Sequence, residues 1–68
     1  MLSVLQVNGK EIDYDNAMQL DALLEFLELS NQPCAVEVNQ TLVPHNERDQ
    51  FTLNEGDSIE IVTLVGGG

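Results

Sequence analysis

The sequence ends on Val65-Gly66-Gly67-Gly68, three glycines directly after a β-branched residue. Glycine loses more conformational freedom on ordering than any other residue, so such an end adds little to a folded core. It provides instead a thin, extensible segment with an unhindered carboxyl carbon, which can thread a narrow channel in another protein. An α-carboxyl group is ionised near neutral pH and can attack an activated phosphate. One interpretation is therefore that a partner recognises Gly66, Gly67 and Gly68 and uses the carboxylate of Gly68 in its own chemistry. The alternative is a frayed end or linker without a function.

Two other side chains are of types that carry chemistry. Cys34 could hold a persulfide, but no histidine, lysine or arginine lies near it in the sequence to activate the thiol, so we interpret it as structural. His45 has no partner at metal-ligand spacing, and one cysteine with one histidine cannot build a zinc site. We interpret His45 as a solvated loop residue.

The remaining site patterns are incomplete. Asp13 and Asp15 resemble the start of a calcium loop, but Met18 stands where that loop needs glycine and Leu24 where it needs its closing glutamate. The sequence shows no Ser-His-Asp set, no paired acid and base, and no phosphate-binding glycine loop followed by lysine. We therefore expect no metal site, no bound cofactor and no enzymatic activity in this chain.

Composition and charge define the class of partner. The chain has 68 residues, enough for one domain, and 43% of them are hydrophobic, as in ordinary globular proteins. Twelve acidic residues oppose only Lys10 and Arg48, which gives a formal net charge of −10. Such a surface repels phosphate backbones and anionic membranes, so we expect neither nucleic acid nor a membrane as partner. It suits basic clefts of other proteins, or serves solubility alone.

The expected location is the cytoplasm. A single cysteine excludes an internal disulfide framework and fits a reducing compartment. No apolar run approaches the roughly 20 residues of a membrane span. The opening residues 1–4 lack the basic segment of a signal peptide.

The elements that position the tail begin with a hairpin. Two alternating runs flank Asn8-Gly9, the preferred pair for a two-residue type I′ turn. This turn fixes the register, and the pleat then separates an apolar face from a polar one. The predicted pairs are Val7 with Lys10, Leu5 with Ile12 and Ser3 with Tyr14. The apolar face is Leu5, Val7, Ile12 and Tyr14; the polar face is Gln6, Glu11 and Asp13.

A helix is predicted next, because four leucines recur at the spacing of one helical face. Asn16 is its predicted N-cap, with Gln19 three residues later in a weak capping box. The segment 30–33, which ends in proline, terminates the helix. The leucine stripe, expected to lie in the core, is Leu20, Leu23, Leu24 and Leu27.

The second half of the chain alternates again. Val36 and Val38 face inward in its first strand, and Gly56 supplies a positive φ in the last turn. The predicted elements are a strand over 34–39, a turn at Asn39-Gln40, a short strand over 41–43, a polar loop over 45–50, an edge strand or packed loop over 51–53, a turn over 54–57 and a long strand over 58–65.

Together these elements predict an α+β fold of the β-grasp, ubiquitin-like type. One helix after a hairpin can bury its stripe only against one face of a mixed sheet, here of four to five strands. The last strand is expected in the centre, parallel to the first. We predict a β-grasp domain over residues 1–65 and a flexible, extended glycine tail over 66–68.

Several segments together resemble the ThiS family, the bacterial sulfur carriers of thiamine biosynthesis. The resemblance covers nearly the whole chain, and its most specific part is the Gly56-Asp57 turn at a fixed distance before a strand that runs into terminal glycines. Many relatives end in two glycines, whereas Gly66 makes a third here, which changes the reach of the tail but not its reacting end. The resembling segments are 7–12, 35–40, 43–44, 55–62 and 65–68.

The resemblance implies a chemistry for Gly68. An E1-like adenylating enzyme (ThiF-like) would adenylate its carboxylate with ATP, and sulfur from a persulfide donor would convert it to a thiocarboxylate. The thiocarboxylate would then give its sulfur to a thiazole synthase (ThiG-like) for the thiazole ring of thiamine. Three other functions stay open: the small subunit of molybdopterin synthase, a ubiquitin-like protein modifier, and an interaction module with an idle tail.

A docking patch for these partners is predicted on the last strand. Val62 and Leu64 lie on the face opposite the helix, and the acidic residues Glu60 and Asp57 could rim them. Partial cover by the first strand and the edge loop is the alternative, because isolated exposed apolar residues are common.

Overall fold

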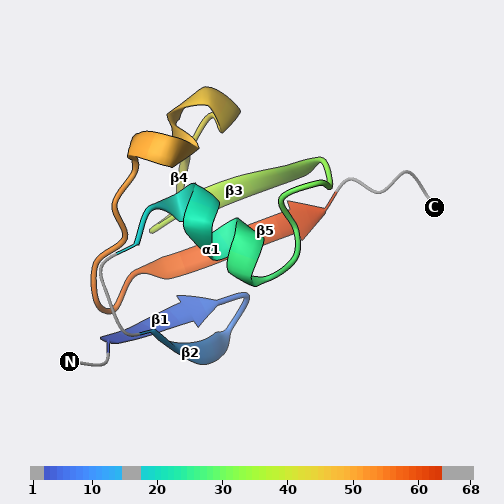
Figure 1. Cartoon of the computed structure of the whole chain (residues 1–68). Helices are drawn as coiled ribbons and strands as arrows, with labels where there is room; N and C mark the ends of the chain where they lie inside the picture. The colour runs from blue at the N-terminus through green and yellow to red at the C-terminus, as the bar shows by residue number, and fades with distance from the viewer. Residues whose placement is uncertain (1–2, 15–17, 64–68) are drawn as a thin grey trace.

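The computed structural model describes residues 3–14 and 18–63, which form a five-stranded mixed sheet with one α-helix on one face (Figure 1). The strands lie in the order β2-β1-β5-β3-β4, so the last strand of the chain is central, as predicted. The predicted tail, residues 66–68, lies outside the described residues. In chain order the elements are β1 (Ser3–Val7), β2 (Lys10–Tyr14), α1 (Leu20–Phe26), β3 (Cys34–Val38), β4 (Thr41–Leu42), the 3₁₀ helix η1 (His45–Gln50) and β5 (Ser58–Thr63).

The N-terminal hairpin has the register that its turn predicts. Asn8 and Gly9 both have positive φ, 50° and 84°, as a type I′ turn requires. All three predicted cross-strand pairs of β1 and β2 are confirmed. The predicted apolar face is buried or half-buried, and Glu11 and Asp13 on the other face are exposed. Turn chemistry and side-chain alternation therefore specify the same pairing.

The central strand β5 is held on both sides. It runs antiparallel to β3 and parallel to β1, with Val7 level with Ile59. Beyond β1, Asn8 continues the contact: its backbone N donates to Ile59 O at 2.8 Å, its Oδ1 accepts from Ile61 N at 2.7 Å, and its Nδ2 donates to Ile61 O at 3.1 Å. The asparagine side chain thus replaces the backbone pairing that the turn removes.

Helix α1 begins later than the sequence predicts. Gln19, not Asn16, is its N-cap residue, and no side-chain hydrogen bond caps it. The prediction of Asn16 is wrong because the chain before the helix pairs with a distant segment. Gln19 is extended and forms an isolated antiparallel bridge with Thr52, flanked by backbone hydrogen bonds of 2.8 and 2.9 Å to the segment 51–53. Long-range pairing outweighs the local capping signal here.

The helix ends at a residue in the left-handed region. Glu28 has φ 62°, and the two hydrogen bonds of a Schellman motif surround it. Glu28 N donates to Glu25 O at 3.0 Å, and Leu29 N donates to Leu24 O at 2.8 Å. Glycine is the usual residue at this position because a Cβ atom is unfavourable there.

Replacement Glu28→Gly is therefore expected to stabilise the fold by about 0.5–1 kcal/mol, because it removes the Cβ penalty at φ 62°. The free energy of unfolding in urea measures the gain. Glu25→Gly is the matched control inside α1, where glycine should cost about 1 kcal/mol relative to a good helix former. A loss of stability in Glu28→Gly would contradict the assignment.

A second hairpin turn holds the other side of the sheet. Asn39 and Gln40 have φ 51° and 71°, and Asn39 Oδ1 accepts a hydrogen bond from Ser58 N at 3.0 Å. Strand β4 covers Thr41–Leu42 only. Val43, the predicted last strand residue, lies beyond it, but its N still donates to Val36 O at 2.9 Å.

The predicted polar loop over 45–50 is wrong, because this segment is the 3₁₀ helix η1. Its first hydrogen bond runs from Glu47 N to Pro44 O at 3.0 Å, the three-residue spacing of a 3₁₀ turn. The burial of Arg48 ties η1 to the body of the protein. A polar surface pattern does not reveal that anchor.

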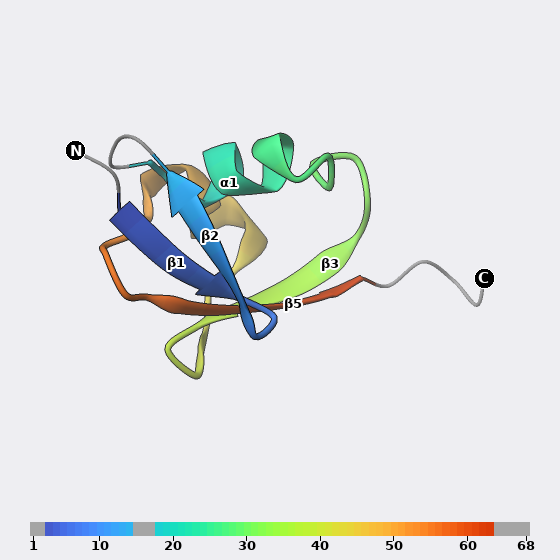
Figure 2. The ribbon, with the colours of Figure 1, turned by 90° about the horizontal axis from the view of Figure 1, so that it is seen from below.

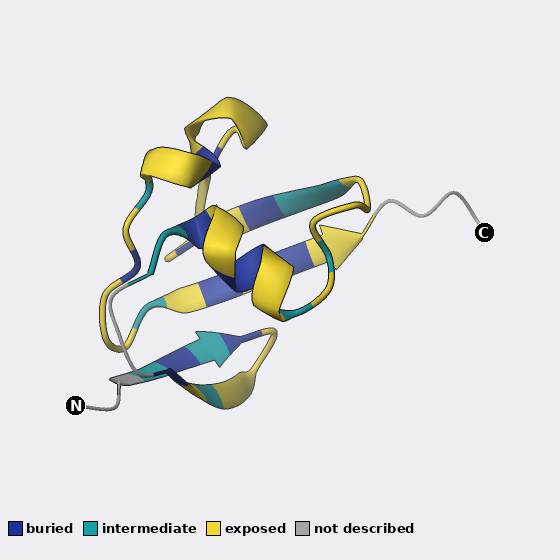
Figure 3. Cartoon of the chain, in the orientation of Figure 1, coloured by how far each residue is buried: buried dark blue, intermediate teal, exposed yellow. Residues whose placement is uncertain are grey.

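The core lies between α1 and the sheet. Figure 2 shows α1 on one side of the strands, and Figure 3 shows buried positions on the helix face that looks toward them. Leu20, Leu23 and Leu24 are buried, and Leu27 at the C-cap is half-buried, so the predicted stripe faces the core. The buried hydrophobic residues described are Leu5, Val7, Tyr14, Leu20, Leu23, Leu24, Val36, Val38, Val43, Leu53, Ile59 and Ile61.

Candidate functional site

The strand that leads toward the glycines is the central strand of the sheet. β5 ends at Thr63, which pairs with Cys34 at the start of β3. The predicted strand continued through Leu64 and Val65, which lie outside the described residues together with Gly66, Gly67 and Gly68. Strand β5 pairs with β1 at its start, at Ser58 and Ile59, and with β3 up to Thr63 at its end.

The helix-free face of the sheet carries two exposed apolar side chains, one near this end and one level with Glu60. Val62 is 58% exposed and lies beside Ala35 of β3 in the cross-strand register. Leu42 of β4 is 59% exposed and lies beside Glu37. Large apolar side chains at this exposure are typical of a contact surface when they gather on one face. The proposed patch residue Val62 is therefore accessible.

Two acidic residues stand directly opposite each other on the same face. Glu37 of β3 pairs with Glu60 of β5, and both are exposed. Like charges in a cross-strand pair destabilise a sheet. On the helix-free face, the two repelling carboxylates lie between the exposed apolar side chains Val62 and Leu42. This face therefore suits a partner that supplies positive charge there.

Asp57 has a different position from the one expected of a rim residue. It precedes β5, at the opposite end of the strand from Val62. Its Oδ1 accepts a hydrogen bond from Asn39 Nδ2 at 3.0 Å, and its Oδ2 accepts one from Asn54 N at 2.8 Å. Gly56 beside it has φ 85°, as predicted. The carboxylate of Asp57 thus closes the turn that starts the central strand.

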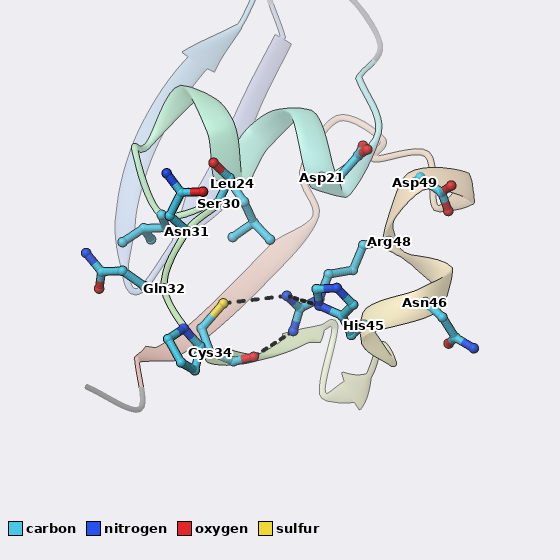
Figure 4. Close-up of a pocket in the computed structure, with 12 residues that line it drawn as sticks. Asp21, Leu24, Ser30, Asn31, Gln32, Cys34, His45, Asn46, Arg48 and Asp49 are labelled. Atoms are coloured by element: carbon cyan, nitrogen blue, oxygen red, sulfur yellow. Dashed lines mark hydrogen bonds between the residues drawn. The ribbon is translucent and has the colours of Figure 1, made fainter. Parts of the chain in front are cut away.

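On the helix side, the fold brings together three side chains that are distant or unremarkable in the sequence. Arg48 is only 7% exposed, and Figure 4 shows its guanidinium between Cys34 and His45. Its Nη2 donates to Cys34 O at 2.6 Å and its Nη1 to Cys34 Sγ at 3.6 Å. Nη1 also lies 3.4 Å from His45 Nδ1.

This cluster revises the interpretation of Cys34 and His45. The sequence predicts a structural role for Cys34 because no basic residue lies near it in the chain. In the structure, η1 places Arg48 beside the Cys34 thiol and His45 beside Arg48. His45 is exposed, as predicted, yet it belongs to η1 rather than to a loop. The available signal was that Arg48 is one of two cationic residues in a strongly acidic chain.

The described residues offer neither a metal-binding cluster nor a membrane-spanning helix. In residues 3–14 and 18–63, no group of three or more His, Cys, Asp or Glu side chains is placed to hold a metal ion. Within those same ranges, no helix is long and apolar enough to cross a membrane.

The sequence match to a known family extends over nearly the whole chain. The sequence model of the ThiS family matches residues 5–68, through the last glycine. The chain belongs to the ThiS family. The ThiS sulfur carrier protein of Bacillus subtilis is 33% identical over 66 residues, which cover 96% of this chain and 100% of that one. The structure also resembles a crystal structure of the thiamine biosynthesis protein ThiS of Geobacter metallireducens, with a TM-score of 0.81 and 29% identity over 96% of this chain and 99% of that chain.

A larger ThiS relative has a different architecture. A thiazole synthase of Paramagnetospirillum magneticum is 39% identical over 64 residues, which cover 94% of this chain but only 20% of that protein. A ThiS-like sequence therefore forms a minor part of a polypeptide named for thiazole synthesis.

Proposed function

We propose that this ThiS family member is a sulfur carrier in thiamine biosynthesis and that it carries the sulfur as a thiocarboxylate on Gly68. The observation that carries the proposal is the family match, which includes the glycines and extends over a β-grasp domain with β5 at its centre. The protein supplies presentation of the carboxylate, and its partners supply the catalytic groups.

The proposed chemistry has three steps. The carboxylate of Gly68 attacks the α-phosphorus of ATP, and pyrophosphate leaves to give an acyl adenylate. The outer sulfur of a persulfide donor then displaces AMP, a far better leaving group than oxide, and forms an acyl disulfide. A second thiol attacks the donor's sulfur in that disulfide, so that the S–S bond breaks, the thiocarboxylate leaves and the donor remains in a disulfide with the thiol. ATP is a substrate of the adenylating partner, so the carrier itself needs no cofactor. A side chain at either of the last two positions would crowd the acyl carbon.

Two partners follow from this scheme. An E1-like adenylating enzyme activates the tail, and a thiazole synthase receives the sulfur. The Paramagnetospirillum relative supports the second partner, because a ThiS-like segment and the name thiazole synthase belong to one polypeptide there. Where the carrier and the thiazole synthase are separate proteins, we therefore expect the carrier to dock on the synthase.

The helix-free face is the proposed docking surface. Val62 offers apolar area near the end of β5, and Glu60 with Glu37 offers negative charge. Leu64 would extend the same strand face. Electrostatic complementarity mainly raises the rate of encounter, and buried apolar side chains mainly slow dissociation. A basic cleft with an apolar floor is therefore the matching surface on the adenylating enzyme.

Replacement Val62→Asp is expected to weaken binding to the adenylating enzyme about tenfold or more, because it removes a central apolar contact and adds charge to an acidic face. Titration calorimetry with the purified enzyme measures the dissociation constant. Phe26→Ser is the matched control: Phe26 is 64% exposed, but it lies on α1 across the sheet. Equal affinities for the two variants would exclude this face as the docking surface.

Intact mass spectrometry tests the function directly. After incubation with ATP, the adenylating enzyme, a persulfide donor and a thiol reductant, the expected mass change is that of one oxygen replaced by sulfur. An unchanged mass would contradict sulfur carriage. A deletion strain that needs thiazole for growth would agree with the proposal, whereas loss of a molybdenum enzyme's activity would indicate molybdopterin synthesis. Isopeptide-linked protein conjugates would indicate a modifier instead.

A further inference from the structure

Arg48 is a buried cation without a carboxylate among its described partners. The groups it contacts are a carbonyl oxygen, a thiol and an imidazole nitrogen. Its Nε is also buried and has no hydrogen-bond partner within residues 3–14 and 18–63. Buried charges in proteins are ordinarily paired, because burial removes their hydration. The positive charge of Arg48 therefore has no anionic partner among the described residues.

A cavity lies in front of this cluster and is large enough for a small molecule. Its volume is about 830 Å³, within the usual range of ligand pockets. Cys34 lines it and is half-buried, so its sulfur can be reached from the cavity. Apolar area comes from Leu24, Leu29 and Pro33. In Figure 4 the thiol and the guanidinium lie next to each other, joined by the dashed line between Cys34 and Arg48.

The charges along the cavity are arranged in two groups. Arg48 beside Cys34 is positive, whereas Asp21 of α1 and Asp49 of η1 also line the cavity and are negative. In Figure 4 the two carboxylates lie on the α1 and η1 side, away from the thiol. This arrangement complements a zwitterion whose ammonium group faces Asp21 and Asp49 and whose sulfur or carboxylate end faces Arg48.

We propose that this cavity binds a low-molecular-weight amino-acid persulfide and that Cys34 accepts its outer sulfur. The choice of a persulfide as the ligand rests on the proposed sulfur-carrier function, while the charge pattern specifies an amino acid. Arg48 Nη1, 3.6 Å from Cys34 Sγ, is placed to hydrogen-bond an anionic sulfur, and charge-assisted hydrogen bonds are the stronger ones. Cys34 is then a second sulfur-carrying position besides Gly68.

The transfer is a thiol exchange that balances without an external oxidant or reductant. The Cys34 sulfur attacks the outer sulfur of R–S–SH, and a new S–S bond to Cys34 forms as the donor's S–S bond breaks. The donor departs as R–SH after taking up the proton that the Cys34 thiol releases. The products are Cys34–S–SH and R–SH, and one sulfur atom has moved.

The test compares two donors on the reduced full-length chain. One is cysteine persulfide; the other is 3-mercaptopropionate persulfide, which lacks the ammonium group. Peptide mapping by mass spectrometry follows the gain of one sulfur atom on the Cys34 peptide over time. We expect cysteine persulfide to react about two- to fivefold faster, the size of effect that partly exposed ion pairs give. Equal rates would overturn the proposed ligand class.

Charge-neutralised variants locate the effect. The double variant Asp21→Asn, Asp49→Asn should lose the preference for cysteine persulfide. The matched control, Glu25→Gln with Glu47→Gln, removes two exposed charges from the same helices at positions that do not line the cavity, and it should keep the preference. A loss of preference in the control as well would overturn the site and indicate general electrostatics.

Arg48→Gln should slow transfer from both donors about tenfold, the size expected for a lost charge-assisted hydrogen bond. An unchanged rate in a folded Arg48→Gln chain would overturn the role of Arg48. Because Arg48 is buried, Arg48→Gln could also affect the fold. We therefore add an NMR binding measurement on the unaltered chain. S-methylcysteine, an unreactive zwitterion, should shift the amide NMR signals of Cys34, His45 and Arg48 selectively. Absence of such shifts would overturn binding in the cavity.

A second sample of the intact chain separates this inference from the proposed function. It is incubated with ATP, the adenylating enzyme, a persulfide donor and a thiol reductant and is then digested, so that its C-terminal peptide reports on Gly68. Sulfur at Gly68 with none at Cys34 overturns the persulfide site alone. Sulfur at Cys34 with none at Gly68 overturns the proposed carrier function alone.

Discussion

A chain lengthened by one alanine after Gly68 is expected to accept no sulfur, while its thermal unfolding stays that of the unaltered protein. The added methyl group crowds the acyl carbon, and the added residue moves the carboxylate out of the position that the adenylating partner provides. The buried hydrophobic residues described all lie between Leu5 and Ile61, so the fold should not respond. Intact mass after incubation with ATP, the adenylating enzyme and a persulfide donor measures sulfur uptake.

A chain lengthened by glycine instead of alanine is the control for length alone. If length is the dominant factor, both extensions are inactive; if the side chain dominates, the glycine extension keeps part of the uptake. Sulfur uptake by the alanine-extended chain at the unaltered rate would show that the terminal carboxylate of Gly68 is not the reacting group. A lower melting temperature would show that the tail contributes to the fold.

The largest expected effect on stability comes from Leu23→Ala. Leu23 is 1% exposed in the middle of α1, and the loss of a buried leucine costs about 2–5 kcal/mol through lost transfer energy and the cavity left behind. A domain of this size has a total stability of only about 3–10 kcal/mol. The variant is therefore expected to be partly or largely unfolded at room temperature, as urea titration followed by circular dichroism would show.

Phe26→Ala is the matched control for Leu23→Ala. It removes a larger apolar side chain from the same helix, but Phe26 is 64% exposed, so the cost should be about 0.5 kcal/mol or less. Comparable destabilisation by the two variants would contradict the assignment of the buried face of α1. The comparison also tests whether Phe26 is covered in solution by a partner or a second copy.

The two faces of the sheet have different roles: one packs against α1, and the other is exposed to partners. The face under α1 stabilises the domain, and η1 adds the cluster of Arg48, Cys34 and His45 at its edge. The free face offers Val62 and the Glu37–Glu60 pair to partners. Strand β5 joins the two, because its side chains alternate between the faces and its end leads toward the glycines.

The local elements of this fold could be predicted from the sequence because short-range chemistry specifies them. Asn8-Gly9 demands a type I′ turn, and this turn alone sets the register of β1 and β2. The leucine stripe of α1 and the alternation in β3 and β5 identify the buried face. The order of the elements predicted the central place of β5, and the resemblance to the ThiS family added the expectation of sulfur chemistry at Gly68.

What could not be predicted depends on contacts between distant residues. Gln19 looks like part of a helix, but its bridge to Thr52 delays the start of α1. The segment 45–50 looks like a polar loop until the burial of Arg48 shows it to be an anchored helix.

The sequence by itself determined the class of fold and the pairing of the first hairpin, because turn residues and side-chain period act locally. The tertiary structure alone decided that the carboxylate of Asp57 accepts a hydrogen bond from Asn39 and that Arg48 lies against Cys34. Those contacts join residues far apart in the chain, and their strength depends on burial and distance, which no local pattern encodes.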